Sequence, residues 1–147
     1  MKEKHINLIK MCVGAHTVSD LYDWQSTRLV KGINSNKPFA RHVTRMRPKR
    51  AEEILNGGSL YWVFKGFTLA RQQILGLEET VGTDNIIRCS IMLSRQIILT
   101  EPYRKRPFQG WRYLKVNEAP RDLGLFSEGD IKLPASLERN LHEIGVF

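Results

Sequence analysis

No apolar run in the sequence approaches the roughly 18 residues that a membrane-spanning helix requires. The apolar stretch near the N-terminus, residues 6–13, is interrupted by Asn7 and Lys10 and is too short and polar for the hydrophobic region of a secretory signal. Cysteine is scarce as well, and Cys12 and Cys89 cannot form the disulfide framework of a small secreted domain. We therefore expect a cytoplasmic protein with no membrane partner.

The motifs of several catalytic and metal-binding classes are also missing. The four histidines are scattered and neither cysteine belongs to a CxxC pair, so we expect no metal site. The sequence has no glycine-rich nucleotide-binding motif and no serine in a nucleophile elbow, and it therefore predicts no cofactor. Gly57 and Gly58 could cradle a phosphate, but a helix stop followed by a turn explains the pair better.

The overall composition is that of an ordinary globular protein. Of the 147 residues, 41% are hydrophobic and 26% are charged, which argues against a disordered chain. A chain of this length suits one domain. No internal repeat and no long linker divides it, so we expect a single domain over residues 1–147.

Positive charge is concentrated in two segments that contain no acidic residue. The chain has 23 Lys and Arg against 15 Asp and Glu, a net charge of +8. Residues 37–50 hold six of the basic residues and residues 103–115 hold five, so the rest of the chain is slightly acidic. Such segments are typical of a protein that binds a polyanion. The alternative is that each is a solvated face whose acidic partners come from elsewhere in the fold.

The hydrophobic pattern predicts an α+β fold with a mostly antiparallel sheet, or a partly closed barrel, and three to four flanking helices. Residues 67–77 fit either a helix or a strand, and the turn at 82–85 predicts a hairpin. Thr17 is a candidate helix cap. Strands are expected at 6–13, 39–46, 59–65, 86–93 and 96–100, and helices at 18–30, 48–56, near Pro120 and at 134–144.

The segment PFQGWRYL, residues 107–114, interleaves aromatic and basic side chains. Unpaired bases stack on aromatic rings while cations neutralise phosphates, so this pattern suits single-stranded nucleic acid. The alternative is that Phe108, Trp111 and Leu114 fill the core.

A second basic cluster, Arg45, Arg47, Lys49 and Arg50, precedes and opens a predicted helix. Cations destabilise a helix N-terminus, whose free N–H groups can bind a phosphate, and this placement favours a functional reading.

These segments also resemble a known family. The strings HINLIKMCVGAHTVSDLYDWQ, TRMRPKRAEEILNGGSLYWVFKG, RCSIML and RPFQGWRYL are similar to a bacterial family known as domain of unknown function 1489. The resemblance covers nearly the whole chain and implies a single-domain protein of this length, but the family name brings no activity.

A fold-level similarity to the ASCH and other PUA-like domains implies a small β-barrel that binds RNA or modified bases. The helix end Ile54-Leu55-Asn56-Gly57 matches the ASCH pattern. The Glu-x-Arg of the following ASCH strand is replaced here by residues 61–65, so the resemblance does not extend to amidohydrolase chemistry.

We therefore expect a module that binds RNA or another polyanion through a basic, aromatic-lined face. The sequence leaves open the oligomeric state and whether residues 37–50 and 103–115 meet in space. The candidate binding residues are Arg41, Arg45, Arg47, Lys49, Arg50, Tyr61, Lys65, Arg104, Arg106, Trp111, Arg112 and Tyr113.

Two alternatives remain open. One is an enzyme acting on a small anionic or nucleoside-like substrate, with Lys65, Thr44 and Glu101 as candidates for acid–base chemistry. The other is a protein-binding or ribosome-associated adaptor that uses the same basic face.

Overall fold

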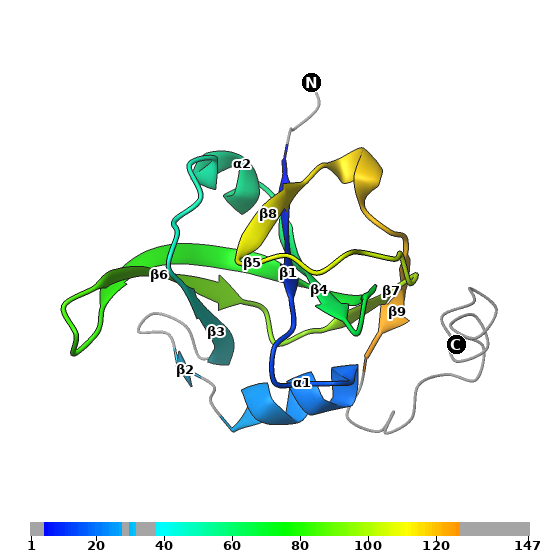
Figure 1. The fold of residues 1–147 in the computed structure, drawn as a ribbon, viewed down its shortest axis with the longest axis horizontal. Helices are drawn as coiled ribbons and strands as arrows, with labels where there is room; N and C mark the ends of the chain where they lie inside the picture. The colour runs from blue at the N-terminus through cyan, green and yellow to red at the C-terminus, as the bar shows by residue number, and fades with distance from the viewer. Residues whose placement is uncertain (1–4, 28–29, 32–37, 127–147) are drawn as a thin grey trace.

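The computed structural model describes residues 5–27, 30–31 and 38–126, and a mixed β-sheet of nine strands organises this part of the chain (Figure 1). The α+β class is thereby confirmed. The strands are β1 (Asn7–Met11), β2 (Val30–Lys31), β3 (Pro38–Thr44), β4 (Ser59–Phe64), β5 (Phe67–Val81), β6 (Ile87–Leu93), β7 (Ile98–Thr100), β8 (Trp111–Leu114) and β9 (Asp122–Leu125).

The sheet is mostly antiparallel, as predicted, but it does not close into a barrel. Its main order is β2-β3-β6-β5-β4-β1-β8, with β7 paired to β5 and β9 paired to β7. Only β1 and β4 run parallel among the described pairs. Within the described strands, β2 and β8 end the order without pairing to each other. The barrel alternative is therefore wrong.

The ambiguous segment at 67–77 belongs to the longest strand, β5. Its first half pairs with β4 and β7, and its second half pairs with β6 after a register shift between Ile74 and Gly76. The predicted hairpin is confirmed, and it extends away from the rest of the sheet (Figure 1). Asn85 takes a left-handed φ of 62° in its turn, a conformation that asparagine tolerates better than most residues.

The described residues contain two α-helices, α1 (Val18–Ser26) and α2 (Ala51–Leu55), and a 3₁₀ turn at Val116–Glu118, so three to four full helices are not found there. The predicted cap is confirmed: Thr17 Oγ1 accepts from the Asp20 N–H at 3.0 Å, and Asp20 accepts from the Thr17 N–H at 3.2 Å. Both helices are shorter than predicted. The helix expected at 134–144 lies outside the described residues.

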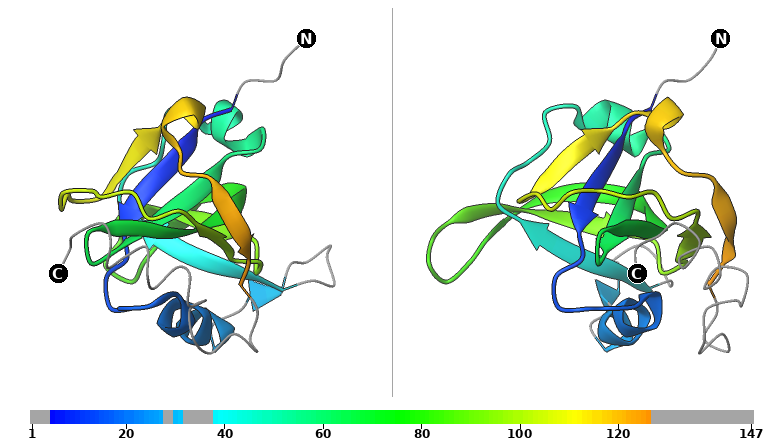
Figure 2. Two further views of the ribbon diagram at one scale, coloured as in Figure 1. Left: turned by 90° about the vertical axis from the view of Figure 1, so that its right-hand side faces the viewer. Right: turned by 45° about the vertical axis from the view of Figure 1, so that its right-hand side comes forward.

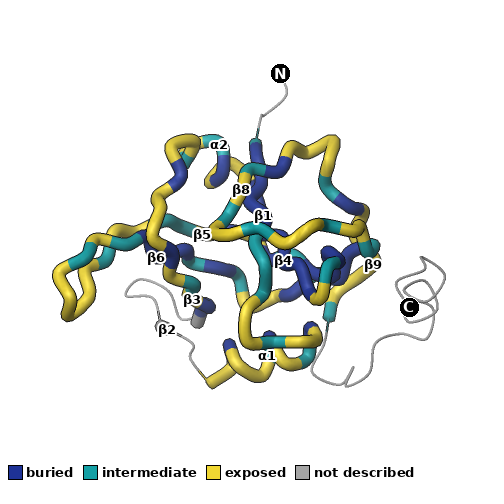
Figure 3. The backbone as a smooth tube through the Cα atoms, in the orientation of Figure 1, coloured by how far each residue is buried: buried dark blue, intermediate teal, exposed yellow. Residues whose placement is uncertain are grey.

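The central strands carry many of the buried residues (Figure 3). On β1, Leu8 contributes to the main core, while the next residue, Ile9, joins a smaller cluster with Tyr61, Val63 and Leu114. Alternate side chains of a strand point to opposite faces, so β1 and β4 are covered on both sides. Figure 2 shows α1 at the end of the sheet where β1 ends and α2 at the opposite end.

Candidate functional site

The two basic segments meet in space. The indole Nε1–H of Trp111 donates to the carbonyl of Met46 at 2.8 Å. The hydroxyl of Tyr113 accepts from the backbone N–H groups of Lys49 and Arg50, at 3.0 and 3.1 Å. These three hydrogen bonds join residues 45–50 to residues 111–113, and we call the joined surface the basic seam.

The alternation of β8 explains why its aromatic side chains reach this surface. Trp111 and Tyr113 lie on the face that packs against the main core, with their rings edge to face and their centroids 5.0 Å apart. Leu114 points to the other face, into the smaller cluster. Both seam aromatics are half-buried, so each packs against the core and still borders solvent. The core and nucleic-acid interpretations of this segment are therefore compatible.

The cations of the seam differ in how they are neutralised. Arg50 forms a two-pronged salt bridge with Glu53, with both N···O distances 2.6 Å, and its guanidinium lies 5.4 Å from the centre of the Tyr113 ring. Arg45, Arg47 and Lys49 are exposed and make no salt bridge with any acid in the described ranges. The seam thus carries three positive charges whose neutralising acids do not come from the described fold.

The N-terminus of α2 is not open to a phosphate at the amides that precede it. The N–H groups of Lys49 and Arg50 already donate to Tyr113, and Glu52 and Glu53 place negative charge in the first turn of the five-residue helix. The attraction that we expected from a helix N-terminus is therefore weakened.

Arg112 and Tyr61 lie on the opposite face of the sheet from Trp111. The Arg112 guanidinium is 4.8 Å from the centre of the Phe108 ring, and Phe108 packs on the smaller cluster. Tyr61 belongs to that cluster with only 6% of its surface exposed, and burial raises the pKa of its hydroxyl. Its ring cannot stack a base from solvent.

The remaining predicted cations lie elsewhere. Arg104 and Arg106 lie in the coil that passes the β4–β5 turn, where the Lys105 N–H donates to the carbonyl of Gly66 at 2.7 Å, next to Lys65. Arg41 is exposed on β3, on the face opposite to its buried neighbour Ala40. Lys37, part of the basic segment, lies outside the described residues.

The three candidate catalytic residues are not brought together. Thr44 lies opposite Cys89 of β6, which in turn lies opposite Glu79 near the end of β5. Lys65 lies just before the start of β5, whereas Thr44 is level with Glu79 near its end. At roughly 3.3 Å per residue, Lys65 and Thr44 are tens of ångströms apart along that strand. The Glu101 carbonyl accepts from Thr68 at 3.3 Å, which places Glu101 at the Lys65 end.

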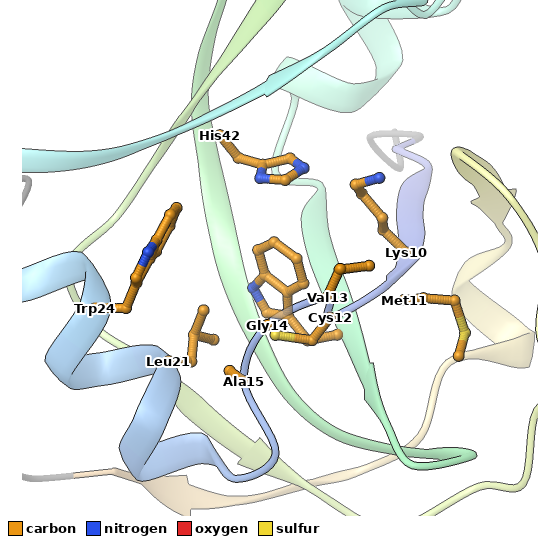
Figure 4. Close-up of a pocket in the computed structure, with 10 residues that line it drawn as sticks. Lys10, Met11, Cys12, Val13, Gly14, Ala15, Leu21, Trp24 and His42 are labelled. Carbon is orange, nitrogen blue, oxygen red and sulfur yellow. The ribbon is translucent and has the colours of Figure 1, made fainter.

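The structure also contains a pocket that the sequence did not reveal, and we call it the α1 pocket (Figure 4). It has a volume of about 150 Å³ and lies between α1, β3, β4 and the segment that leaves β1. In Figure 4 the Trp24 indole forms one wall, and the Lys10 side chain extends beside the His42 imidazole with its amine turned away from the ring. Its residues include Lys10, Cys12, Trp24, His42 and Trp62.

One sequence signal pointed toward this pocket: Lys10 is the one charged residue in the mostly apolar stretch 6–13. In the sheet, Lys10 lies opposite Trp62 of β4 on one side and opposite Trp111 of β8 on the other. Directly opposed side chains share a face. The α1 pocket and the basic seam are therefore on the same face, with Lys10 between them.

Burial dominates the electrostatics of the α1 pocket. It lowers the pKa of His42 to about 4, with the positive charge of Lys10 adding to the effect. It also lowers the pKa of Lys10, and it raises the pKa of Cys12 to about 12, with a smaller contribution from Asp20. At neutral pH the imidazole is uncharged and the thiol is protonated, so the pocket holds no activated thiolate.

Two polar features of the α1 pocket bear on ligand binding. His42 Nε2 is buried and has no hydrogen-bond partner among the described residues. The His42 ring meets Trp62 edge to face with centroids 5.1 Å apart, and the Trp62 indole N–H is already used, donating to Gln72 Oε1 at 2.9 Å.

Comparison with known proteins identifies a family and no characterised relative. A family model described as Protein of unknown function (DUF1489) matches residues 8–147. Searches of the curated proteins and of the solved structures find no match. In the described ranges, no helix is long and apolar enough to cross a membrane, and no group of three or more His, Cys, Asp or Glu side chains could hold a metal ion.

Proposed function

The chain belongs to the DUF1489 family, whose description names no activity, and we propose that it binds RNA or single-stranded nucleic acid through the basic seam. The observation that carries the proposal is the contact between residues 45–50 and 111–113. It joins exposed cations that make no salt bridge with the described acids to half-buried aromatic rings on one surface. Either segment alone would be an ordinary solvated face.

The chemistry of the seam matches the two parts of a nucleotide strand. Arg45, Arg47 and Lys49, exposed and without a salt bridge to the described acids, can neutralise phosphates, and the accessible part of Trp111 offers a surface for a base. Aromatic stacking requires bases that are not already stacked and paired, so the seam favours single strands, loops and ends over a duplex. Arg104 and Arg106 precede β8 in the chain and lie in the coil beside the β4–β5 turn, outside the seam.

Binding is better supported than catalysis. Thr44 lies far along β5 from Lys65, and the pKa of Cys12, about 12, leaves its thiol protonated at neutral pH. Thr44 therefore does not share a site with Lys65 and Glu101. The adaptor alternative uses the same basic face. An experiment with purified components distinguishes the two, because direct nucleic-acid binding needs no protein partner.

The test is a fluorescence anisotropy titration of the purified protein with labelled 12-nucleotide RNA and DNA single strands and the matching duplexes, at several salt concentrations. We expect tighter binding to single strands and an affinity that falls steeply with salt. Replacing Arg45, Arg47 and Lys49 together by Gln should reduce the slope of log affinity against log salt by about 2, because each phosphate contact on a single strand contributes about 0.7.

A matched control removes three arginines elsewhere, by replacing Arg88, Arg95 and Arg121 with Gln. The control should change the slope much less, since these residues lie outside the seam. Absence of binding at low salt, or binding that salt does not weaken, would refute the proposal. If the two triple variants had equal effects, binding would depend on the net charge of the protein and not on the seam.

A further inference from the structure

The α1 pocket has walls and an opening suited to one flat ring. Trp24 and Trp62 both line it, and the Trp62 ring is held edge to face against His42. Val13 is 88% exposed and Trp24 is 44% exposed, so the pocket opens to solvent between the end of β1 and α1. A cavity of about 150 Å³ holds one benzene-sized ring in a protein interior.

The polar groups of the pocket call for a ligand with hydrogen-bonding atoms on its ring edge. Buried polar atoms are nearly always hydrogen-bonded, yet His42 Nε2 has no partner in the described structure. Lys10 lines the same pocket and makes no salt bridge with the described acids. An ammonium group is a donor only, whereas a neutral imidazole nitrogen either donates or accepts according to its tautomer.

The position of Lys10 connects this pocket to the proposed binding surface. Lys10 lies opposite Trp62 in β4 and opposite Trp111 in β8. Adjacent strands are about 4.8 Å apart, so the pocket and the seam are separated by little more than the width of β1. A strand that crosses the seam can therefore turn one base into the pocket.

We propose that the α1 pocket holds a single unstacked pyrimidine base of the bound strand. The ring lies against the Trp24 and Trp62 walls, a ring carbonyl accepts from Lys10, and the ring nitrogen beside that carbonyl pairs with His42 Nε2. The volume selects one ring over the two rings of a purine. This inference rests on the proposed function, because the seam delivers the base, but the pocket can be tested alone.

The experiment uses free nucleosides, which carry no phosphate and so do not depend on the seam. Uridine, cytidine and adenosine are titrated into the full chain at millimolar concentrations, and binding is followed by tryptophan fluorescence and by the indole N–H signals in NMR spectra. We expect a pyrimidine nucleoside to shift the tryptophan signals and adenosine to shift them much less. Comparison of uridine with cytidine identifies which ring edge His42 prefers.

Two variants separate the polar contacts from the fold. His42→Phe keeps a ring against Trp62 and removes the nitrogens, and Lys10→Met removes the charge while keeping the length of the side chain. Each should weaken pyrimidine binding about tenfold, the effect of one lost hydrogen bond with a charged or buried group. Thermal unfolding of both variants shows whether the fold is retained. Glu52→Gln, exposed on α2, is the control and should leave nucleoside binding unchanged.

Oligonucleotides distinguish failure of this inference from failure of the proposed function. We expect oligo(U) or oligo(C) to bind more tightly than oligo(A), and His42→Phe to remove that preference without changing the salt dependence. If oligonucleotides bind without base preference and nucleosides cause no shift, the pyrimidine pocket is refuted while the seam proposal stands. If a pyrimidine nucleoside binds but no oligonucleotide does, the pocket stands and nucleic-acid binding by the seam is refuted.

Discussion

The Trp111 indole N–H donates to the Met46 carbonyl at 2.8 Å, although the two residues are 65 positions apart in the chain. Met46 lies between Arg45 and Arg47, so this bond fixes the backbone that carries two exposed cations of the seam. An edge strand of the sheet thereby holds a loop in place through a side chain. The positive charges of Arg45 and Arg47 are therefore held close to the Trp111 ring.

Replacing Tyr113 by Phe should separate this ordering from charge. The substitution removes one hydroxyl that accepts from Lys49 and Arg50, and the loss of these hydrogen bonds costs about 1 kcal/mol of folding free energy. RNA affinity should fall severalfold with no change in net charge. Urea unfolding and anisotropy titrations measure the two effects. Tyr103→Phe is the control: Tyr103 is 41% exposed and lies outside the seam, and an equal loss there would contradict the ordering role.

Arg47 and Arg50 should differ in binding although they are three residues apart. Arg50 is paired with Glu53 at 2.6 Å, whereas Arg47 makes no salt bridge with the described acids. Arg47→Gln should lower the salt slope by about 0.7, the contribution of one phosphate contact on a single strand. Arg50→Gln should lower the salt slope less, because Arg50 must first break its salt bridge with Glu53 before it can contact a phosphate. Anisotropy titrations at four salt concentrations compare the two, and a larger effect of Arg50→Gln would contradict the assignment.

His42 should make folding stability depend on pH. Burial lowers the pKa of His42 from 6.5 to about 4, so between these values the unfolded chain binds a proton that the folded chain does not. Stability therefore falls as the pH drops from 6.5 to 4, by up to about 3 kcal/mol. Lys10 stays positively charged and the Cys12 thiol stays neutral throughout this window, so neither accounts for the change.

The measurement is urea unfolding between pH 7 and pH 4 for the unmodified chain and for His42→Phe. Carboxylates with lowered pKa values, such as Asp84 and Asp122, lose their contribution as the pH falls further, and they do so in both proteins. The difference between the two curves isolates the imidazole. Parallel curves would show that His42 titrates normally in the fold.

Cys12 should resist alkylation in the folded protein. Its thiol pKa is raised to about 12 from 9.0, so the reactive thiolate is about a thousandfold scarcer than in the unfolded chain. The Cys89→Ser variant leaves Cys12 as the single thiol. Its reaction with iodoacetamide at pH 8, followed by mass spectrometry with and without urea, gives the ratio of rates. Equal rates in the two conditions would show that the fold does not suppress ionisation of the Cys12 thiol.

The residue pattern predicts local structure better than it predicts the site. Thr17 and Asp20 form the expected cap because a capping box needs only residues three apart. The faces of the seam could not be assigned in advance, because Trp111 and Arg112 are adjacent in the chain and alternation sends them to opposite sides once β8 pairs with β1. The α1 pocket depends on the pairing of β1 with β4 and on the packing of α1 and β3 beside them, and no local pattern specifies these long-range contacts.

The exposure of Leu55 is a second feature that the local sequence pattern does not predict. Ile54 and Leu55 are both apolar and adjacent in α2, yet Ile54 is fully buried and Leu55 is 45% exposed. The helix spans only five residues, so the structure has room to bury one side chain against β5 and not its neighbour. Periodicity is informative over several turns and loses its meaning in a single one.

Gly58 fills a packing role that no other residue can take, and this bears on the idea that Gly57 and Gly58 hold a phosphate. A Cβ at Gly58 would lie 2.2 Å from the carbonyl oxygen of Ile6 and 2.6 Å from that of Ile54. Two carbonyl oxygens at that position would repel an anion, so the glycine serves the close approach of β1 and α2.

Gly58→Ala forces the backbone apart and should cost about 3 kcal/mol or more. Gly14→Ala is the control: unlike Gly58, Gly14 has a positive φ, 90°, but it has open space around it, and the substitution should cost only about 1 kcal/mol. Urea unfolding of the two variants decides the matter, and a Gly58→Ala protein as stable as the unmodified chain would show that the two elements are not held at this distance.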